Sequence, residues 1–256
     1  MQFAKSILLL AALTTGSIAR PEGHQRRQYT TPTTTSATSS GGAWTDIPSS
    51  YSTSGFGGVT SNTGSGVTYA GNVGNPYGSN IIEVSSADAS QYKYVVQFQG
   101  SNTEDWTVAI WNKYGSDGTM DGWYGNACRT FTLAAGATTY IAFDEDSQGG
   151  WAASPGSTIP TDSNGGYAAT WGEFDFGSTT NSEWSGFDVS AIAAQNAGLT
   201  VQGMQICDAI GGTCSSITPN AATVSNAYTT AETDVGGIGG NLAAGPVRLA
   251  VIIDFS

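Results

Sequence analysis

Histidine is almost missing from this sequence of 256 residues: His24 is the only one. Serine and cysteine hydrolases that work through a triad need an imidazole base in the folded domain. The common zinc and copper sites also take histidine ligands. His24 stands in the N-terminal leader, so these mechanisms are excluded for the rest of the chain. We expect no metal and no cofactor, and carboxylates are the only abundant acid–base groups.

Positive charge is also scarce beyond the leader. From Trp44 onward the chain has 19 acidic and four basic side chains, a formal net charge of −15. Such a surface repels phosphate backbones and anionic lipids, so we expect neither nucleic acid nor membrane as a partner. No apolar run beyond the leader approaches the length that a membrane span needs.

The N-terminus has the pattern of a secretory signal peptide. Lys5 precedes an apolar run from Ile7 to Leu13, and small residues at Ser17 and Ala19 fit a cleavage site. Arg26-Arg27 is either a dibasic processing site or a solvated charge pair. A Thr/Ser-rich tract follows, typical of a linker. We therefore predict a secreted protein, extracellular or in the cell wall. Its predicted parts are a signal peptide (1–19), a possible pro-segment (20–28), a linker (29–43) and a β-sandwich domain (44–256).

The remainder predicts an all-β fold with few short helices. Residues 247–255 alternate, with Val247, Leu249, Val251 and Ile253 on one face, and glycine-rich turns separate similar segments. Many short strands between such turns indicate an antiparallel β-sandwich. The other expected strands are 81–84, 92–98, 106–110, 129–133, 139–144, 167–176, 187–192 and 199–206. A turn is expected at 86–92 and a short helix at 220–230.

Three cysteines remain to be assigned. Cys207 and Cys214 bracket a loop of six residues directly after an expected strand. In an exported protein this spacing predicts a local disulfide bond. Cys128 is then left without a partner, and no base is available that would make it catalytic.

Several unusual segments together resemble one protein family. They are Gly71–Val84, Gly122–Asn126, Ala142–Gly149, Thr170–Phe176 and Trp184–Ile192. In this order they are similar to the Asp f 4-like fungal allergens over residues 44–255. The resemblance implies a secreted fungal protein that human IgE binds, with no well-established biochemical activity. The family has cysteines where this chain has Ser52 and Ala169, so one family disulfide is expected to be lost.

A second resemblance, at the level of the fold, is to thaumatin-like proteins. Trp171–Phe174 and Phe187–Ser190 are similar to two strand motifs of that family. It implies that Glu173 and Asp188 line a cleft that binds β-1,3-glucan and sometimes cleaves it. The third aspartate of the family would fall near Ala193 or Ala194, and the many thaumatin-type disulfides are absent. These departures put catalysis in doubt.

Independently of either resemblance, the residue pattern of the strand expected at 167–176 indicates a sugar-binding site. Alternation places Trp171, Glu173 and Asp175 on one face. An indole can stack on a pyranose while carboxylates accept hydroxyl protons, and paired carboxylates also serve as acid and base in glycoside hydrolysis. The plainer interpretation is an ordinary acidic solvent face. Further candidate stacking rings, each beside glycines, are Trp123, Trp151 and Trp184, although burial is the commoner role for each.

We therefore expect a secreted protein of the fungal cell wall that binds β-glucan or a related polysaccharide without turnover. The alternative is a glycoside hydrolase of endo-β-1,3-glucanase type. In that case Glu173 is the acid and Asp188 or Asp175 is its partner. We further expect the face of Trp171 and the acids to form a concave groove.

Overall fold

The computed structural model describes residues 43–61 and 63–256. The predicted signal peptide, the possible pro-segment and all but the last residue of the linker lie outside this part. Its strands are β1 (Ile81–Val84), β2 (Tyr94–Gly100), β3 (Trp106–Asn112), β4 (Arg129–Leu133), β5 (Thr139–Phe143), β6 (Ser147–Pro155), β7 (Trp171–Ser178), β8 (Trp184–Ser190), β9 (Met204–Asp208), β10 (Cys214–Ile217), β11 (Val224–Ser225), β12 (Gly240–Leu242) and β13 (Val247–Ile253). Its helices are α2 (Ile192–Ala197) and the single 3₁₀ turns η1 (Gly66–Thr68), η2 (Ala89–Gln91), η3 (Thr179–Asn181) and η4 (Pro219–Ala221).

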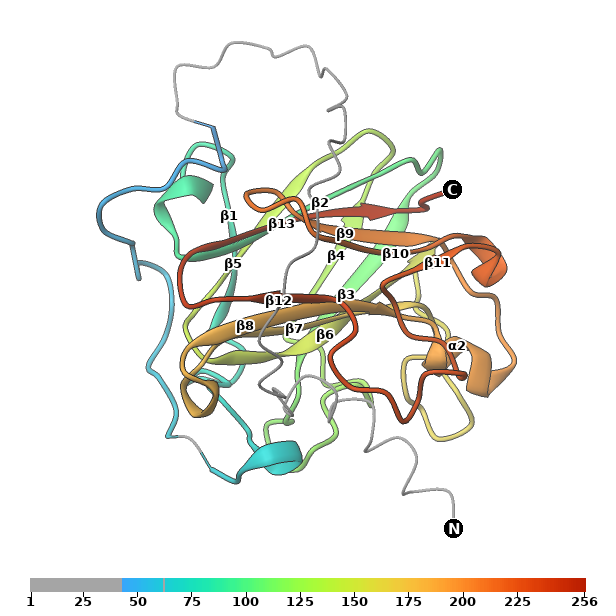
Figure 1. The fold of residues 1–256 in the computed structure, drawn as a ribbon, viewed down its shortest axis with the longest axis horizontal. Coiled ribbons are helices and arrows are strands. Elements are labelled where there is room, and N and C mark those ends of the chain that lie inside the picture. The colour runs from blue at the N-terminus through green and yellow to red at the C-terminus, as the bar shows by residue number, and fades with distance from the viewer. Residues whose placement is uncertain (1–42, 62) are drawn as a thin grey trace, which may run out of the picture.

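The strands form two packed sheets, which confirms the predicted β-sandwich (Figure 1). One sheet has seven strands in the order β1-β5-β2-β13-β9-β10-β11, and the other has six in the order β12-β8-β7-β6-β3-β4. The named strands pair antiparallel with one exception, β13 beside β2, which run parallel. No helix of the described residues is long and apolar enough to cross a membrane.

The core between the sheets follows from the alternation in the strands. Val247, Leu249, Val251 and Ile253 of β13 are all buried there, as predicted. They belong to the same cluster as the inward-facing aromatic rings of the six-stranded sheet. One of these rings is Trp151, whose indole stacks on Phe174 with ring centroids 5.7 Å apart.

Two expectations about local structure were wrong. The helix expected at 220–230 is absent, because the chain there makes only the η4 turn and then the short strand β11. Residues 199–206 were expected to be extended throughout, but the strand begins only at Met204. Helix α2, which we did not predict, ends at Gly198 in the left-handed region, a conformation that glycine adopts without strain. Short apolar runs near glycine do not separate strand from helix by their periodicity.

The predicted disulfide bond is confirmed. Cys207 of β9 and Cys214 of β10 lie directly opposite each other and are bonded, with Cα atoms 4.1 Å apart. Cys128 is free and half-buried, and burial raises the pKa of its thiol. The disulfide therefore joins two neighbouring strands of the seven-stranded sheet.

Gly172 of β7 is required by the ring opposite it. A Cβ atom at this position would lie 2.3 Å from Cε2 of the Trp151 indole. We expect Gly172→Ala to lower the free energy of unfolding by about 1–3 kcal/mol, because the core cannot accept the added carbon without shifting a buried ring. Urea denaturation followed by tryptophan fluorescence measures this loss. The control is Gly58→Ala, where the added Cβ meets its nearest atom at an ordinary 3.5 Å. Equal effects of the two changes would contradict the steric explanation.

Candidate functional site

The register of the six-stranded sheet brings the predicted acids together on its outer face. Glu173 of β7 lies directly opposite Asp188 of β8, and two residues along β7, Asp175 lies opposite Gln148 of β6. Residues opposite each other in an antiparallel pair project to the same side, with Cβ atoms about 4.5–5.5 Å apart. The shared face that the sequence predicted is therefore present, and Asp188 belongs to it.

Lys113 joins this group just beyond the end of β3. Its backbone N–H donates to the Gln148 carbonyl at 2.8 Å, so it continues the same line across the sheet. We call the five side chains the polar row: Lys113, Gln148, Glu173, Asp175 and Asp188. All five are buried, with between 0 and 3% of each residue exposed. The predicted acids thus do not lie on an open solvent face.

The buried polar atoms of this row lack partners. Several side-chain atoms make no hydrogen bond to any residue that the structure describes: Lys113 Nζ, Gln148 Nε2, Glu173 Oε1 and Oε2, Asp175 Oδ1, and Asp188 Oδ1 and Oδ2. Trp111 Nε1 is a further buried donor without a partner among the described residues. Trp111 of β3 pairs with Gly150 of β6, which in turn pairs with Glu173 of β7, so Trp111 lies on the same side of the sheet as Glu173. Native proteins leave few such groups, because each costs about 1–3 kcal/mol. A cluster of them calls for a functional explanation.

Burial also determines the protonation of the three acids. It raises the pKa of Glu173 well above its ordinary value, and the charge of Asp188 adds to this while Lys113 opposes it. Burial likewise raises the pKa of Asp188. For Asp175, burial and then the charge of Asp146 raise the pKa. These carboxyl groups therefore tend to keep their protons at pH values where exposed carboxyls are ionised.

Lys113 is the one base of the row. Burial lowers the pKa of its ammonium to about 8, and the nearby charges of Asp175 and Glu173 partly oppose this shift. At neutral pH the row combines an ammonium with carboxyl groups of raised pKa, so it holds hydrogen-bond donors beside acceptors. This combination, rather than carboxylates alone, defines its chemistry.

Tryptophan rings enclose one side of the row, and three of the four candidate stacking rings, Trp123, Trp151 and Trp171, are buried. Trp171 and Trp123 are 5% and 6% exposed and pack with Trp111 in one cluster on the outer face. Trp171 Nε1 donates to the Tyr167 carbonyl at 2.9 Å. Trp151 lies in the core between the sheets, so it cannot stack on a sugar. Only the fourth predicted ring, Trp184, is exposed, at 42%.

Two further groups border the row. Asp146 is buried and fully bonded: its Oδ2 accepts from the Tyr69 hydroxyl at 2.6 Å, and its Oδ1 accepts from the Thr179 N–H at 3.1 Å. Tyr228 lies on the β8 side. Burial, with the charges of Asp188 and Glu173, raises the pKa of Tyr228 to about 12. In the part of the chain that is described, no group of three or more His, Cys, Asp or Glu residues could hold a metal ion.

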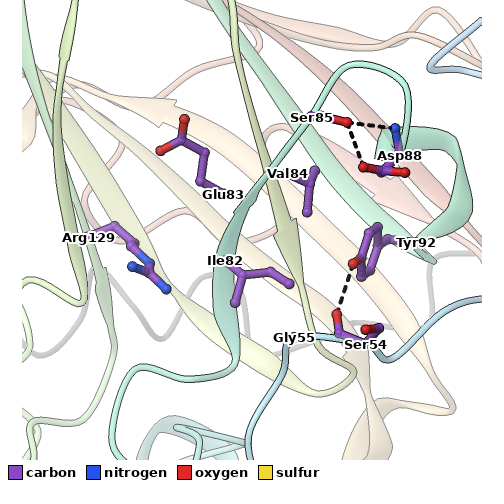
Figure 2. A pocket seen from close by; sticks show the side chains of 9 residues that line it. All are labelled: Ser54, Gly55, Ile82, Glu83, Val84, Ser85, Asp88, Tyr92 and Arg129. Atoms are coloured by element: carbon purple, nitrogen blue, oxygen red, sulfur yellow. Dashed lines mark hydrogen bonds between the residues drawn. The ribbon is translucent and has the colours of Figure 1, made fainter.

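The three acids are buried, so they do not line an open groove of the kind that we expected, and a surface hollow lies elsewhere. This hollow, of about 430 Å³, follows β1 at the edge of the seven-stranded sheet. Figure 2 shows Glu83, Asp88 and Arg129 around it, with the Tyr92 hydroxyl bonded to the Ser54 carbonyl. None of the three acids lines it.

Sequence reasoning missed three members of this arrangement, namely Lys113, Gln148 and Trp111. For two of them a signal was present, because Trp111 and Lys113 are two residues apart and continue the alternation of the strand predicted at 106–110. Gln148 is the second residue of β6, and the pair Gly149-Gly150 that follows it reads as a turn.

Comparison with known proteins gives the family. The sequence matches the Allergen Asp f 4-like domain over residues 79–253. It is 54% identical over 214 residues to "Allergen Asp f 4" from Aspergillus fumigatus, an alignment that covers 83% of this chain and 66% of that protein. The chain thus spans slightly less than two thirds of this relative's length.

Two solved structures have partly similar folds. One is the protein elicitor MoHrip2 from Magnaporthe oryzae (14% identity, TM-score 0.38, 62% of this chain and 98% of that one). The other is the thaumatin-like xylanase inhibitor TLXI (12% identity, TM-score 0.36, 62% and 97%). The match to the family domain, together with the identity to the Aspergillus fumigatus allergen, shows that the chain belongs to the Asp f 4-like allergen family.

Proposed function

We propose that this protein is a secreted, cell-wall-associated protein that binds β-glucan or a related polysaccharide through the polar row. The observation that supports binding is the set of buried side-chain atoms without partners on one face of the six-stranded sheet. The disulfide bond between Cys207 and Cys214 is consistent with secretion, since such bonds persist in oxidising compartments.

The composition of the row suits a sugar. Each sugar hydroxyl donates one hydrogen bond and accepts others, so a site needs acceptors and donors close together. The carboxyl oxygens of Glu173, Asp175 and Asp188 are acceptors, while Lys113 Nζ and Trp111 Nε1 are donors. A polymer whose hydroxyls fill these positions would remove the cost of the unpaired groups. The net charge of −15 beyond Trp44 favours a ligand without phosphate or sulfate.

Retention on insoluble β-1,3-glucan tests this proposal. We expect Glu173→Leu to weaken retention more than tenfold, because leucine fills the space but offers no acceptor. Glu173→Gln keeps an acceptor, so its affinity should stay within about tenfold of the parent protein. The dissociation constant from depletion isotherms is the measurement.

Glu83→Leu is the matched control, since Glu83 is exposed on β1 of the other sheet. Circular dichroism and the midpoint of urea unfolding establish that each variant is folded. Unchanged retention by folded Glu173→Leu would refute binding through the polar row. Retention lost equally in Glu83→Leu would point to a non-specific effect.

One observation favours the second candidate, a glycoside hydrolase of endo-β-1,3-glucanase type. Glu173, which has a raised pKa, faces Asp188 across one strand pair, and paired carboxyl groups about 5–9.5 Å apart can act as acid and partner. Reducing-sugar release measured in the same samples distinguishes the two. A hydrolase releases sugar and loses this activity in Glu173→Gln, because the proton donor is gone. A binding protein releases none.

A further inference from the structure

The chain between β11 and β12 passes along the edge of β8 where Asp188 lies. It leaves β8 after Tyr228, which pairs with Ser190, and it returns at Gly240, opposite Phe187. We call residues 229–239 the strap. In Figure 1 it is the red segment that turns toward α2 before reaching β12, and the Thr230 N–H donates to the Gln195 side chain of that helix. Both of its ends are therefore fixed on the strand that supplies one of the two opposed acids.

The C-terminal end of the strap, at Ile238 and Gly239, is held by hydrogen bonds to two side chains that come just before the strap in the sequence, those of Asn226 and Tyr228. The Tyr228 hydroxyl accepts the Ile238 N–H at 3.1 Å. The Asn226 amide bonds both backbone groups of Gly239: its Oδ1 accepts the N–H, and its Nδ2 donates to the carbonyl, both at 2.9 Å. These three hydrogen bonds form a catch that holds the strap against β8.

Gly239 brings the strap into direct contact with an acid of the polar row. Its φ is +105°, and a Cβ atom there would lie 2.7 Å from the Asp188 Cβ and 2.2 Å from the Phe187 carbonyl oxygen. No other residue type fits this position, so backbone can approach Asp188 closely. Tyr228, which pairs with Ser190 of β8, also lies on the β8 side of the acids. The strap therefore covers the β8 side of the polar row.

The middle of the strap has little to hold it. Asp234, Val235, Gly236 and Gly237 are exposed, and Val235 shows 48% of its surface. The hydrogen bonds of residues 232–235 run within the strap and to its first residues, such as Val235 N–H to the Glu232 carbonyl. None of its side chains belongs to the three apolar clusters. Segments with few buried contacts and local bonds open at low cost.

We propose that the strap is a gate that must swing away from β8 before a ligand reaches the polar row, and that Asn226 and Tyr228 are its catch. This inference rests on the proposed function, because the gate admits the ligand of that same site. The gate explains how the side chains of the polar row, each less than 4% exposed, can bind a ligand, because the structure has the strap in its closed position. Gly237 and Gly239, both with positive φ, are the hinge of the returning end.

Carboxyl labelling tests the gate without any ligand. Carbodiimide with glycine ethyl ester modifies accessible carboxyl groups, and peptide mass spectrometry gives the rate at each one. We expect Asn226→Ala and Tyr228→Phe each to raise the labelling rates of Glu173 and Asp188 at least tenfold. Exposed Glu83 serves as the internal reference, and its rate should not change. Asn164→Ala, in the exposed loop before β7, is the matched control.

Hydrogen exchange of the same variants completes the test. Amides of residues 230–239 should exchange faster in Asn226→Ala, whereas those of β7 and β8 keep their protection, which shows that the fold persists. Strap amides that exchange as in the parent protein, or labelling rates that stay unchanged when the strap opens, would overturn the gate. If the strap opens in these variants but the protein does not bind glucan, the proposed function is refuted and the gate is not.

Discussion

Replacing Arg248 by methionine is expected to lower the free energy of unfolding by about 3–5 kcal/mol, because several buried backbone carbonyls lose their donor and each unpaired group costs about 1–3 kcal/mol. Arg248 of β13 is completely buried. Its guanidinium donates to five backbone carbonyls, those of Trp44, Asp46, Ser90, Lys93 and Val247, at 2.9–3.3 Å. Methionine has a similar volume, but it leaves these carbonyls without their donor. Urea unfolding monitored by tryptophan fluorescence gives the difference.

Two companion variants define this effect. Arg248→Lys should recover only part of the loss, because an ammonium cannot reproduce the planar fork of five donors. Arg129→Met is the control: that arginine is exposed, and its Nε donates to one carbonyl, that of Ile81, at 2.9 Å. A loss below 1 kcal/mol for Arg248→Met would show that water replaces the guanidinium and that the segment around Trp44 does not depend on it.

The polar row is expected to make the protein less stable as the pH rises. Glu173 and Asp188 have raised pKa values in the folded chain, so above about pH 4.5 the unfolded chain loses protons that the folded chain keeps. Each proton retained in this way removes about 1.4 kcal/mol of stability per pH unit, until the pH reaches the folded pKa.

The double variant Glu173→Gln/Asp188→Asn removes this dependence. We expect its free energy of unfolding to change less between pH 5 and pH 7 than that of the parent protein, and to be higher at pH 7. Unfolding curves at half-unit steps of pH supply the comparison, with Glu83→Gln as the control at an exposed carboxyl. If the parent protein gains stability over this range relative to the double variant, the acids are ionised in the folded state.

The strands of this protein, and the face that each one buries, could be predicted from the sequence where residues close in sequence determine them. The alternation in β13 gave the core positions Val247 to Ile253 correctly, and the period of two along β7 placed Glu173 and Asp175 together. The disulfide also followed from a local spacing. In each case the determining contacts lie within one strand or one hairpin.

Burial of the site could not be predicted, because chain segments distant in sequence cover it. Trp171 lies against Trp111, 60 residues earlier on β3, with ring centroids 5.1 Å apart. Asp188 is covered by Gly239, which belongs to a segment beyond three further strands. The pattern on β7 cannot distinguish a face covered in this way from a solvent face, so the sequence left both interpretations open for Trp171 and the acids. The neighbours Gly149 and Gly150 of Trp151 read as a loop, whereas the residue that makes room for its ring in the core is Gly172 of β7.

The parallel pairing of β13 with β2 has a consequence for how the protein matures. The last strand of the chain lies in the middle of the seven-stranded sheet, and Arg248 reaches Trp44 across 204 residues of sequence. While the chain is being synthesised, β2 and β9 lack the strand that lies between them, and no local contact replaces it. Such long-range pairing makes folding slow and dependent on the complete chain. We therefore expect the polypeptide to acquire its native structure only after residues 247–253 have been synthesised and have paired with β2 and β9.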